Sequence, residues 1–286
     1  MIPTLSIVIV CKDEPALAQT LDGVTAQADE TCEIIVVDAS AEPAGPDRPG
    51  VRLLAYTQPP GRTVTIAHQR NAGVQAATGE IVVFVDAGCL PRPGWLARLT
   101  APILAGAETV VAGLTVSPGD RDGLYDAGAR AAGPYLSECP TLNLAFRRDL
   151  CLRVGGFDES FAYGSDVDFS WRVQDAGERI RSAPDAVVSH DWGGPCRQAR
   201  RSYVYGRARA RLYRKHRARR AGLLRREPMV VVYPLFLLGL PLTLLWPYYP
   251  LLLVVPAWRN RRHGVVRTLT DHLLYGAGVL RELAAG

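Results

Sequence analysis

The 286-residue sequence lacks the marks of several protein classes. Its six cysteines contain no C-x-x-C pair, and its N-terminus has neither a basic leader nor a small-residue cleavage site. We therefore expect no disulfide scaffold and a reduced, cytosolic compartment. With 48% hydrophobic and 21% charged residues, the chain is too apolar for a disordered protein, and a globular fold is expected.

Three motifs of nucleotide and hydrolase chemistry are also missing. No G-x-G-x-x-G follows the first hydrophobic run, where residues 10–14 read Val-Cys-Lys-Asp-Glu, and there is no G-x-x-x-x-G-K-[ST]. These absences argue against a dinucleotide oxidoreductase and a phosphate-loop NTPase. No nucleophile elbow marks a Ser/His/Asp hydrolase.

Two segments of the C-terminal third lack charge of one sign or of both. Residues 197–226 contain thirteen Arg or Lys residues and no acid, whereas the rest of the chain contains 20 basic and 28 acidic residues. Residues 229–258 contain no charged residue. The net charge of +5 is therefore a property of one segment.

In the N-terminal half, short β-branched runs alternate with segments of helical spacing, which is typical of βαβ units on a mostly parallel sheet. The predicted strands are 5–10, 32–38, 51–56 and 81–86, and the predicted helices are 15–27, 65–77, 149–154 and 166–176. Asp38 and Asp86 each end a predicted strand, so we expect both carboxylates at the sheet edge where ligands bind. The alternative is that each one caps the turn or helix that follows.

Seven motifs occur in the order found in the inverting family 2 glycosyltransferases, which the sequence resembles over roughly residues 5–192. They are residues 6–14, 35–40, 69–73, 79–86, 143–148, 154–159 and 164–172. Each motif alone is weak, but seven in one order are a specific signal. The resemblance implies an α/β domain of the nucleotide-sugar-binding GT-A fold, with a mostly parallel, Rossmann-like sheet, and an enzyme that transfers a hexose with inversion.

The resemblance also implies which residues bind the donor. Glu14 and Asp38 would accept hydrogen bonds from the base or ribose of a nucleotide, and Arg70 would reach the base or diphosphate with its planar donors. Asp86 matches the first acid of the family's Asp-x-Asp motif, which addresses ribose and a divalent cation. Gly88 stands at the second acidic position, so direct metal ligation by that position is lost.

Metal binding and catalysis are assigned in the same way. Mg²⁺ or Mn²⁺ on a diphosphate keeps several waters, so Asp86 and a second group would suffice as protein ligands. His190 matches a late metal-binding histidine of the family, although a structural hydrogen-bonding role is an equal alternative. Asp166 matches the aspartate of the family's Glu-Asp motif, the general base for the acceptor hydroxyl, and Ser165 replaces the glutamate. A helix N-cap role for Asp166 is compatible with catalysis.

The two unusual C-terminal segments favour a membrane partner. Tyrosines and a leucine among the arginines predict a basic interfacial helix over 197–228, whose polar face meets anionic lipid. The alternative is a solvated helix. A nucleic-acid partner is disfavoured, because it does not explain the uncharged segment that follows. For 229–258, basic residues at 225–226 and 259–262 favour a re-entrant hairpin turning near 246–250 over a single span. A hairpin buried between protomers is a third possibility.

The run at 205–211 and the terminal His272-x-x-Tyr275-Gly276 resemble family members that build bacterial exopolysaccharide on a polyprenyl-diphosphate carrier. We predict a GT-A domain (1–196), a basic interfacial helix (197–228) and an apolar hairpin with a terminal helix (229–286). The predicted function is transfer of a sugar from a nucleoside diphosphate to a lipid-linked acceptor at the cytoplasmic face of the cell membrane, in cell-envelope synthesis. The alternative is a family member that binds nucleotide sugar or lipid without turnover, as Gly88 and Ser165 indicate.

Overall fold

The computed structural model describes residues 4–42, 48–57, 65–117, 133–259 and 264–285. The chain divides into two compact units, Met1–Asp191 and Trp192–Gly286. The division lies five residues before the boundary that the sequence predicted between 196 and 197. Residues 43–47, between the predicted strands 32–38 and 51–56, and Arg261 and Arg262 of the predicted basic flank lie outside the described residues.

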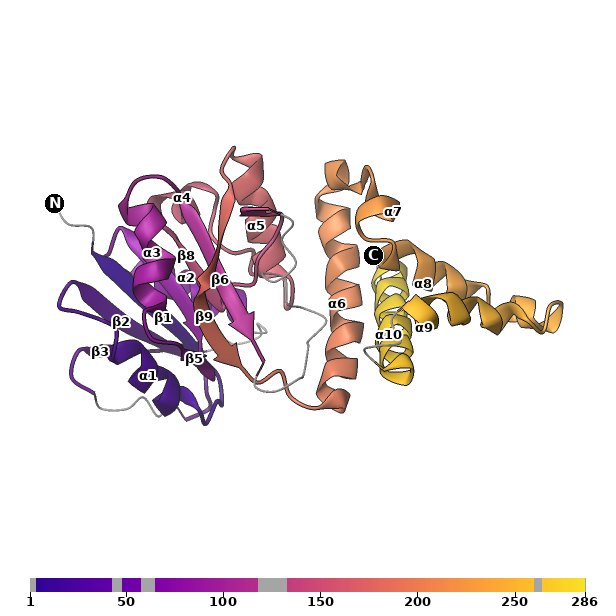
Figure 1. Cartoon of the computed structure of the whole chain (residues 1–286), viewed down its shortest axis with the longest axis horizontal. Helices are drawn as coiled ribbons and strands as arrows, with labels where there is room; N and C mark the ends of the chain where they lie inside the picture. Colours follow the sequence, from indigo (N-terminus) through magenta and orange to yellow (C-terminus); the bar gives the residue numbers. More distant parts are fainter. Residues whose placement is uncertain (1–3, 43–47, 58–64, 118–132, 260–263, 286) are drawn as a thin grey trace. The chain divides into compact units, whose positions relative to one another are not determined.

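The first unit is built on a sheet that contains nine strands in the described part of the chain (Figure 1). The strand order is β3-β2-β1-β4-β8-β6-β9-β5, and β7 pairs with β9. The strands are β1 (Leu5–Cys11), β2 (Cys32–Asp38), β3 (Val51–Ala55), β4 (Ile81–Asp86), β5 (Cys89–Pro91), β6 (Val110–Val116), β7 (Tyr135–Leu136), β8 (Asn143–Arg147) and β9 (Ile180–His190). The helices are α1 (Leu17–Thr25), α2 (Ile66–Ala76), α3 (Trp95–Leu104), α4 (Arg148–Arg153) and α5 (Ser165–Asp175).

The centre of the sheet is parallel, as the sequence predicted. Strands β1, β2 and β4 are runs rich in valine and isoleucine that are almost entirely buried, which is the composition of strands covered on both faces. β1 pairs in parallel with β2 and with β4, and β2 pairs in parallel with β3. The sheet as a whole is mixed, because β8 runs antiparallel to both β4 and β6.

Aromatic packing fixes the helices on the two faces of the sheet. Helices α2, α4 and α5 lie on one face, and α1 and α3 lie on the other (Figure 1). On the first face the rings of Phe157 and Phe169 stack with centroids 4.5 Å apart, and Phe84 of β4 contacts Phe157. On the second face Trp95 is fully buried and its Nε1 donates to Asn143 Oδ1 at 2.8 Å. Burial of each such side chain contributes roughly 1.5–3 kcal/mol, so α2 and α5 are held firmly beside the strand ends.

The register of the parallel strands brings the two strand-end carboxylates together. Cys11 at the end of β1 pairs with Asp38, and its neighbour Val10 pairs with Asp86. The main chain continues this order past the strands, because Ala39 N donates to Cys11 O at 3.0 Å. Asp38 and Asp86 therefore lie at one edge of the sheet, as expected from their positions in the sequence.

The second unit is helical. Its elements are α6 (Pro195–Lys215), α7 (Leu223–Arg226), α8 (Met229–Leu238), α9 (Val254–Arg259) and α10 (Val265–Ala284), with 3₁₀ turns at Arg217–Arg220, Leu240–Leu244 and Tyr249–Leu253. α10 packs against α6, α8 and α9. A β-carbon on Gly206 would lie 2.0 Å from Tyr275 O, and one on Gly278 would lie 2.0 Å from Tyr203 O. Glycine is therefore required where the backbones of α6 and α10 meet.

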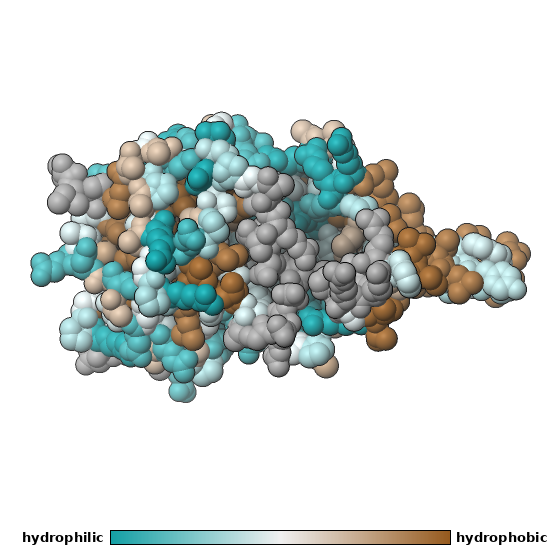
Figure 2. All heavy atoms as spheres, viewed as in Figure 1, coloured by the Kyte–Doolittle hydropathy of each residue, from teal (hydrophilic) through white to brown (hydrophobic). Residues whose placement is uncertain are grey.

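Residues 229–258, which we call the apolar hairpin, fold back on themselves. The Tyr249 hydroxyl donates to Phe236 O at 3.0 Å, and the two rings stack with centroids 5.2 Å apart. Leu244 and Leu245 lie between these contacts and are 87% and 86% exposed. Hydrophobic side chains gather over the hairpin (Figure 2). Among the described residues no helix is both long and apolar enough to span a membrane.

Candidate active site

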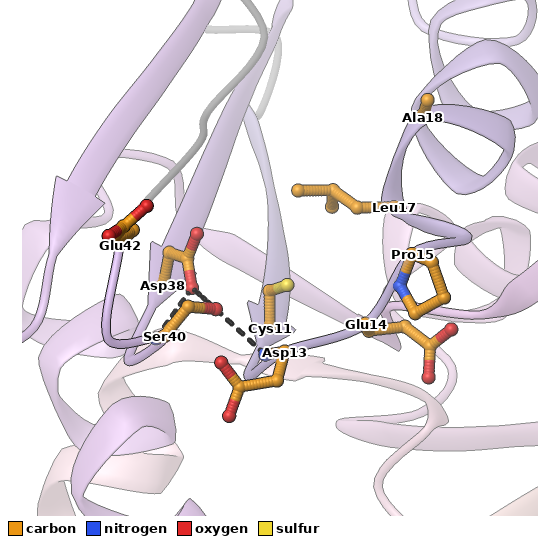
Figure 3. Close-up of a pocket in the computed structure, with 9 residues that line it drawn as sticks. All are labelled: Cys11, Asp13, Glu14, Pro15, Leu17, Ala18, Asp38, Ser40 and Glu42. Carbon is orange, nitrogen blue, oxygen red and sulfur yellow. Dashed lines mark hydrogen bonds between the residues drawn. The ribbon is translucent and has the colours of Figure 1, made fainter.

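A pocket of about 400 Å³ opens at the carboxyl ends of β1 and β2 (Figure 3). It is lined by Cys11, Asp13, Glu14, Pro15, Leu17, Ala18, Asp38, Ser40 and Glu42. Four of these nine side chains are carboxylates and none is a cation. The pocket therefore suits a ligand part that presents N–H or O–H donors, such as a base or a ribose, better than a phosphate.

Asp38 is the most buried carboxylate of this pocket, with 2% exposure. Its Oδ1 accepts hydrogen bonds from Ser40 N at 2.9 Å and from Ser40 Oγ at 2.5 Å. Ser40 Oγ in turn accepts a hydrogen bond from Asp13 N at 2.7 Å, where the backbone has a left-handed φ of 51°. Ser40 thus orients Asp38 and ties the two loops together, a role that the sequence analysis did not identify.

Glu14 lies beside the position of the missing second acid. Gly88 has a φ of +88°, and a β-carbon there would lie 3.3 Å from Glu14 Cδ and 3.5 Å from its Oε2. The turn is held by a hydrogen bond from Gly88 N to Thr20 Oγ1 at 2.9 Å. The Glu14 carboxylate therefore occupies space that a side chain at position 88 would need.

Helix α2 connects the strand ends to the rest of the site through consecutive residues. Gln69 Nε2 donates to Cys11 O at 2.6 Å and to Val37 O at 3.1 Å, which joins β1 to β2. Asn71 Nδ2 donates to Phe157 O and Asn71 Oδ1 accepts from Phe157 N, both at 2.8 Å. One short stretch of α2 therefore holds both the donor edge of the sheet and the loop that leads to α5.

Arg70, between these two residues, lies beside Asp86 and not in the 400 Å³ pocket. Its Nη2 is 3.6 Å from Asp86 Oδ2, and its Nη1 donates to Ser165 Oγ at 3.5 Å. The guanidinium lies over the Phe157 ring, 5.8 Å from the centroid. Arg70 Nε and Asp86 Oδ1 are both buried without a hydrogen-bond partner among the described residues. Such groups are costly unless a ligand completes them.

Asp166 lies in the first turn of α5. It is not the N-cap, because Gly164 occupies that position with a φ of 86°. Asp166 Oδ1 accepts a hydrogen bond from Val167 N at 2.9 Å. Burial raises the pKa of the Asp166 carboxyl, the positive charge of Arg70 opposes that rise, and Glu138 adds to it. A carboxylate with a raised pKa is a stronger proton acceptor, which suits general base catalysis.

His190 ends β9 and pairs in register with Cys89 of β5. Its Nδ1 is 3.6 Å from Cys89 Sγ. Burial raises the pKa of the Cys89 thiol well above its usual range, and the charges of Asp86 and Glu14 add to the rise. Cys89 therefore lies close to Asp86 and His190, the two residues that the sequence predicted as metal ligands, and to Glu14, a predicted donor-binding residue. Within the described ranges, however, no three His, Cys, Asp or Glu side chains form a group that could hold a metal ion.

Solved structures that share this fold include a mannosyltransferase. The mannosyltransferase PcManGT from Pyrobaculum calidifontis, in complex with GDP-Man and Mn²⁺, superposes with a TM-score of 0.70 at 21% identity and covers 98% of this chain and 87% of that one. GalNAc-T7 with UDP, GalNAc and Mn²⁺ has a TM-score of 0.55 at 18% identity, covering 74% and 50%. The fold is the GT-A fold that the sequence predicted.

The sequence model of glycosyl transferase family 2 matches residues 6–164, more than half of the chain, and that of glycosyl transferase family group 2 matches residues 129–261. The chain belongs to glycosyl transferase family 2.

The pre-mycofactocin glycosyltransferase of Mycobacterium tuberculosis is 36% identical over an alignment of 167 residues, and the match covers 52% of this chain and 35% of that protein. The glucosyl-dolichyl phosphate glucuronosyltransferase of Haloferax volcanii is 26% identical over 204 residues, 61% and 64%. The chain thus spans about a third of the first relative's length.

Proposed function

We propose that this protein transfers a hexose, with inversion, from a nucleoside-diphosphate sugar to a lipid-linked acceptor, with Asp166 as the general base. The observation that carries the proposal is the arrangement around Arg70. Its guanidinium lies between Asp86 at the donor edge of the sheet and Ser165, the residue before Asp166. A donor held at the strand ends would therefore lie beside the base.

The donor's nucleotide is assigned to the acidic pocket. Asp38 and Glu14 would accept hydrogen bonds from the base and ribose, because the pocket offers acceptors and no cation. The buried, unpartnered Oδ1 of Asp86 would serve the ribose or a diphosphate-bound cation. GDP-Man and UDP in the two structural neighbours support a nucleoside-diphosphate donor.

The reaction is a displacement at the anomeric carbon. The acceptor hydroxyl loses its proton to an Asp166 carboxylate oxygen as its oxygen bonds to that carbon, and the bond from the carbon to the diphosphate breaks. The nucleoside diphosphate leaves with the bonding electron pair, and Asp166 later releases the proton to solvent. Direct attack from the opposite face inverts the configuration. The half-buried position of Asp166 supports this role, because it leaves the carboxylate within reach of an acceptor while partial burial raises its pKa.

A divalent cation fits this site in part. Asp86 Oδ1 is a buried carboxylate oxygen without a partner in the described structure, which suits Mg²⁺ or Mn²⁺. Position 88 offers no ligand, so the cation would be held by Asp86 and the diphosphate oxygens, with His190 as the candidate second protein ligand. When bound, it would supply charge that stabilises the departing diphosphate. The Mn²⁺ in both structural neighbours supports this assignment.

The second unit is assigned to the membrane. Residues 192–286 contain 18 basic and three acidic residues. Glu282 pairs with Arg207, and Glu227 pairs with Arg209, but three acids cannot neutralise eighteen basic residues, and the unit keeps a net charge of +15. Anionic lipid would attract this charge while the apolar hairpin inserts.

The length of the hairpin sets how deeply it would insert. The ten residues of α8 rise about 15 Å, which is half of the ~30 Å hydrocarbon core of a bilayer. We therefore propose that the hairpin occupies one leaflet, at the cytoplasmic face of the cell membrane. There it would bring the active site to a polyprenyl-linked acceptor of exopolysaccharide or cell-envelope synthesis. The dolichyl phosphate in the name of the Haloferax volcanii relative supports a lipid-linked acceptor.

The test uses the whole chain on vesicles that contain anionic lipid. UDP- and GDP-sugars are screened by thermal unfolding with and without Mn²⁺, since a ligand at about 100 times its dissociation constant adds about 2.7 kcal/mol of stability. The donor that stabilises the protein is then incubated with a polyprenyl-diphosphate-linked sugar, whose hydroxyl groups serve as acceptors, and release of nucleoside diphosphate is measured. Asp38→Asn should lose the stabilisation. Stabilisation without release for any acceptor would establish the alternative, a family member that binds without turnover.

A further inference from the structure

Arg70 makes contacts that donor binding alone does not explain. The side chain is 6% exposed and lies outside the 400 Å³ pocket. It packs over Phe157, a residue that Asn71 clamps through both main-chain groups. The guanidinium is therefore fixed in place before any ligand arrives.

We propose that Arg70 is a positioning residue for the base: its guanidinium holds the first turn of α5 against the end of β4 and keeps the Asp166 carboxylate ionised. The inference rests on the proposed function, because it assumes that Asp166 acts as the base. It differs from the donor-binding role that the family resemblance implied for Arg70.

The start of α5 supports this role. The helix begins after a glycine, so its N-cap residue has no side chain to hold the first turn. Ser165 Oγ accepts the 3.5 Å hydrogen bond from Arg70 Nη1, and the next residue is Asp166. The other end of the same guanidinium contacts Asp86. One planar group thus joins the donor edge to the helix turn that carries the base.

The charges around Asp166 also favour this role. From α2 it faces Arg70, from the segment after β7 it faces Glu138 and Cys139, and on its own helix Asp168 and Arg172 follow. Arg172 is engaged elsewhere, because its Nε donates to Asp168 Oδ2 at 2.8 Å and its Nη2 donates to a main-chain oxygen. Glu138 and burial raise the pKa of Asp166, whereas Arg70 lowers it. Arg70 therefore opposes the effects that would protonate the base.

Ser165 adds to this effect. A glutamate here, as in the family's motif, would place a second carboxylate beside Arg70 and take part of its charge. The serine hydroxyl accepts a hydrogen bond without adding a negative charge, so the guanidinium acts on Asp86 and Asp166 alone. The replacement of glutamate by Ser165 thus keeps more of the Asp166 carboxylate in its ionised, proton-accepting form, whereas the sequence alone raised it as a sign of lost activity.

The test measures the titration of Asp166 directly, with ¹³C-carboxyl-labelled aspartate and assignment by Asp166→Asn. Arg70→Met should raise the pKa of Asp166 by one unit or more, since a neighbouring opposite charge typically shifts a carboxyl by about 1–3 units. Ser165→Glu should shift it in the same direction with Arg70 still present, and Arg70→Lys should shift it less than Arg70→Met. Arg148→Met is the matched control. Arg148 lies near the start of β4, at the other end of the strand from Asp86, where its Nε donates to Val74 O of α2.

The activity readout has a defined sign. A base works when ionised, so transfer is present above its pKa and is lost as the pH falls. The acid limb of the kcat profile should therefore move to higher pH in Arg70→Met and Ser165→Glu, but not in Arg148→Met. If the titration of Asp166 in both variants equals that of the parent, the inference is wrong even if transfer occurs. If the titration shifts but the parent shows no transfer, the inference about Arg70 stands and the proposed function fails.

Discussion

The two units of the chain differ in the sign of their charge and in how many large hydrophobic side chains they expose. Residues 1–191 contain 15 basic and 25 acidic residues, whereas residues 192–286 contain 18 basic and three acidic residues. Among the described residues, five large hydrophobic side chains are exposed in the first unit and eighteen in the second. The first unit buries most of its large apolar side chains and gathers four of its acids at one pocket. The second unit presents apolar groups and cations together, which suits the boundary between water and an anionic apolar phase.

This contrast explains why chain-wide averages are uninformative here. A net charge of +5 hides a first unit of −10 and a second of +15. If sugar transfer and membrane docking are separate properties of the two units, a substitution should be able to abolish either one and leave the other unchanged.

The largest expected effect is on chemistry alone. Asp166→Asn keeps the volume of the side chain and removes the base, so transfer should fall by about 10²- to 10⁴-fold. Nucleotide affinity, measured by calorimetry, and vesicle binding should stay at the parental values. Asp175→Asn, at the exposed end of the same helix, is the control. More than half of the parental turnover in Asp166→Asn would remove Asp166 from this role.

The next effect is on docking alone. Leu244→Asp with Leu245→Asp places two charges at the tip of the apolar hairpin. Burial of the two leucines in lipid would contribute about 3 kcal/mol, so without them vesicle affinity in flotation assays should fall by about a hundredfold. Leu53→Asp with Leu104→Asp, two exposed leucines of the first unit, should leave binding unchanged. Equal losses in the two pairs would mean that the hairpin is not the docking surface.

A smaller effect separates charge from insertion. Arg217→Gln with Arg225→Gln removes two exposed cations of the second unit. At about 1 kcal/mol per cation near anionic lipid, low-salt affinity should fall by about thirtyfold. The difference from the parent should vanish in 1 M salt, where screening acts over ~3 Å. Persistence of the difference at high salt, or its appearance in Arg153→Gln of the first unit, would contradict an electrostatic contribution.

The smallest expected effect is on metal binding, where restoring the missing acid should not increase Mn²⁺ affinity. Gly88→Asp restores the family's second acid in sequence, but its side chain would begin 3.3 Å from Glu14 Cδ with the backbone at φ +88°. We therefore expect no increase in Mn²⁺ affinity by paramagnetic resonance and a loss of stability of about 1–3 kcal/mol. Gly106→Asp, with similar φ and open space, isolates the backbone strain. Tighter Mn²⁺ binding would show that position 88 still fits a metal.

The sequence predicted those parts of the fold that depend on local pattern. Valine and isoleucine runs that end in Asp38 and Asp86 located the strands and the functional edge, because the period and the end of a buried strand are visible in the chain. It did not show that β8 enters the sheet antiparallel between β4 and β6. That pairing joins segments far apart in the sequence, and the strand's own residues do not specify it.

The sequence named candidate residues for the site but did not show how they are arranged. The sequence singled out Arg70 and Asp166, yet their relation depends on Phe157 packing that fixes α2 against α5. In the same way, nothing local indicated that Glu14 lies over Gly88 or that Ser40 orients Asp38. Motif positions identify candidates, whereas the charge that each side chain experiences comes from tertiary neighbours.

The shortness of the apolar hairpin has a consequence for the membrane curvature to which the protein would bind best. An insertion that ends at mid-bilayer adds area to one leaflet and none to the other, so it acts as a wedge and favours convex curvature. Tyr249 and Phe236 hold its two arms together, and the wedge therefore keeps its width when it inserts. Small vesicles should bind the protein more tightly than large ones of the same lipid, because their outer leaflet already has the packing gaps that a wedge fills.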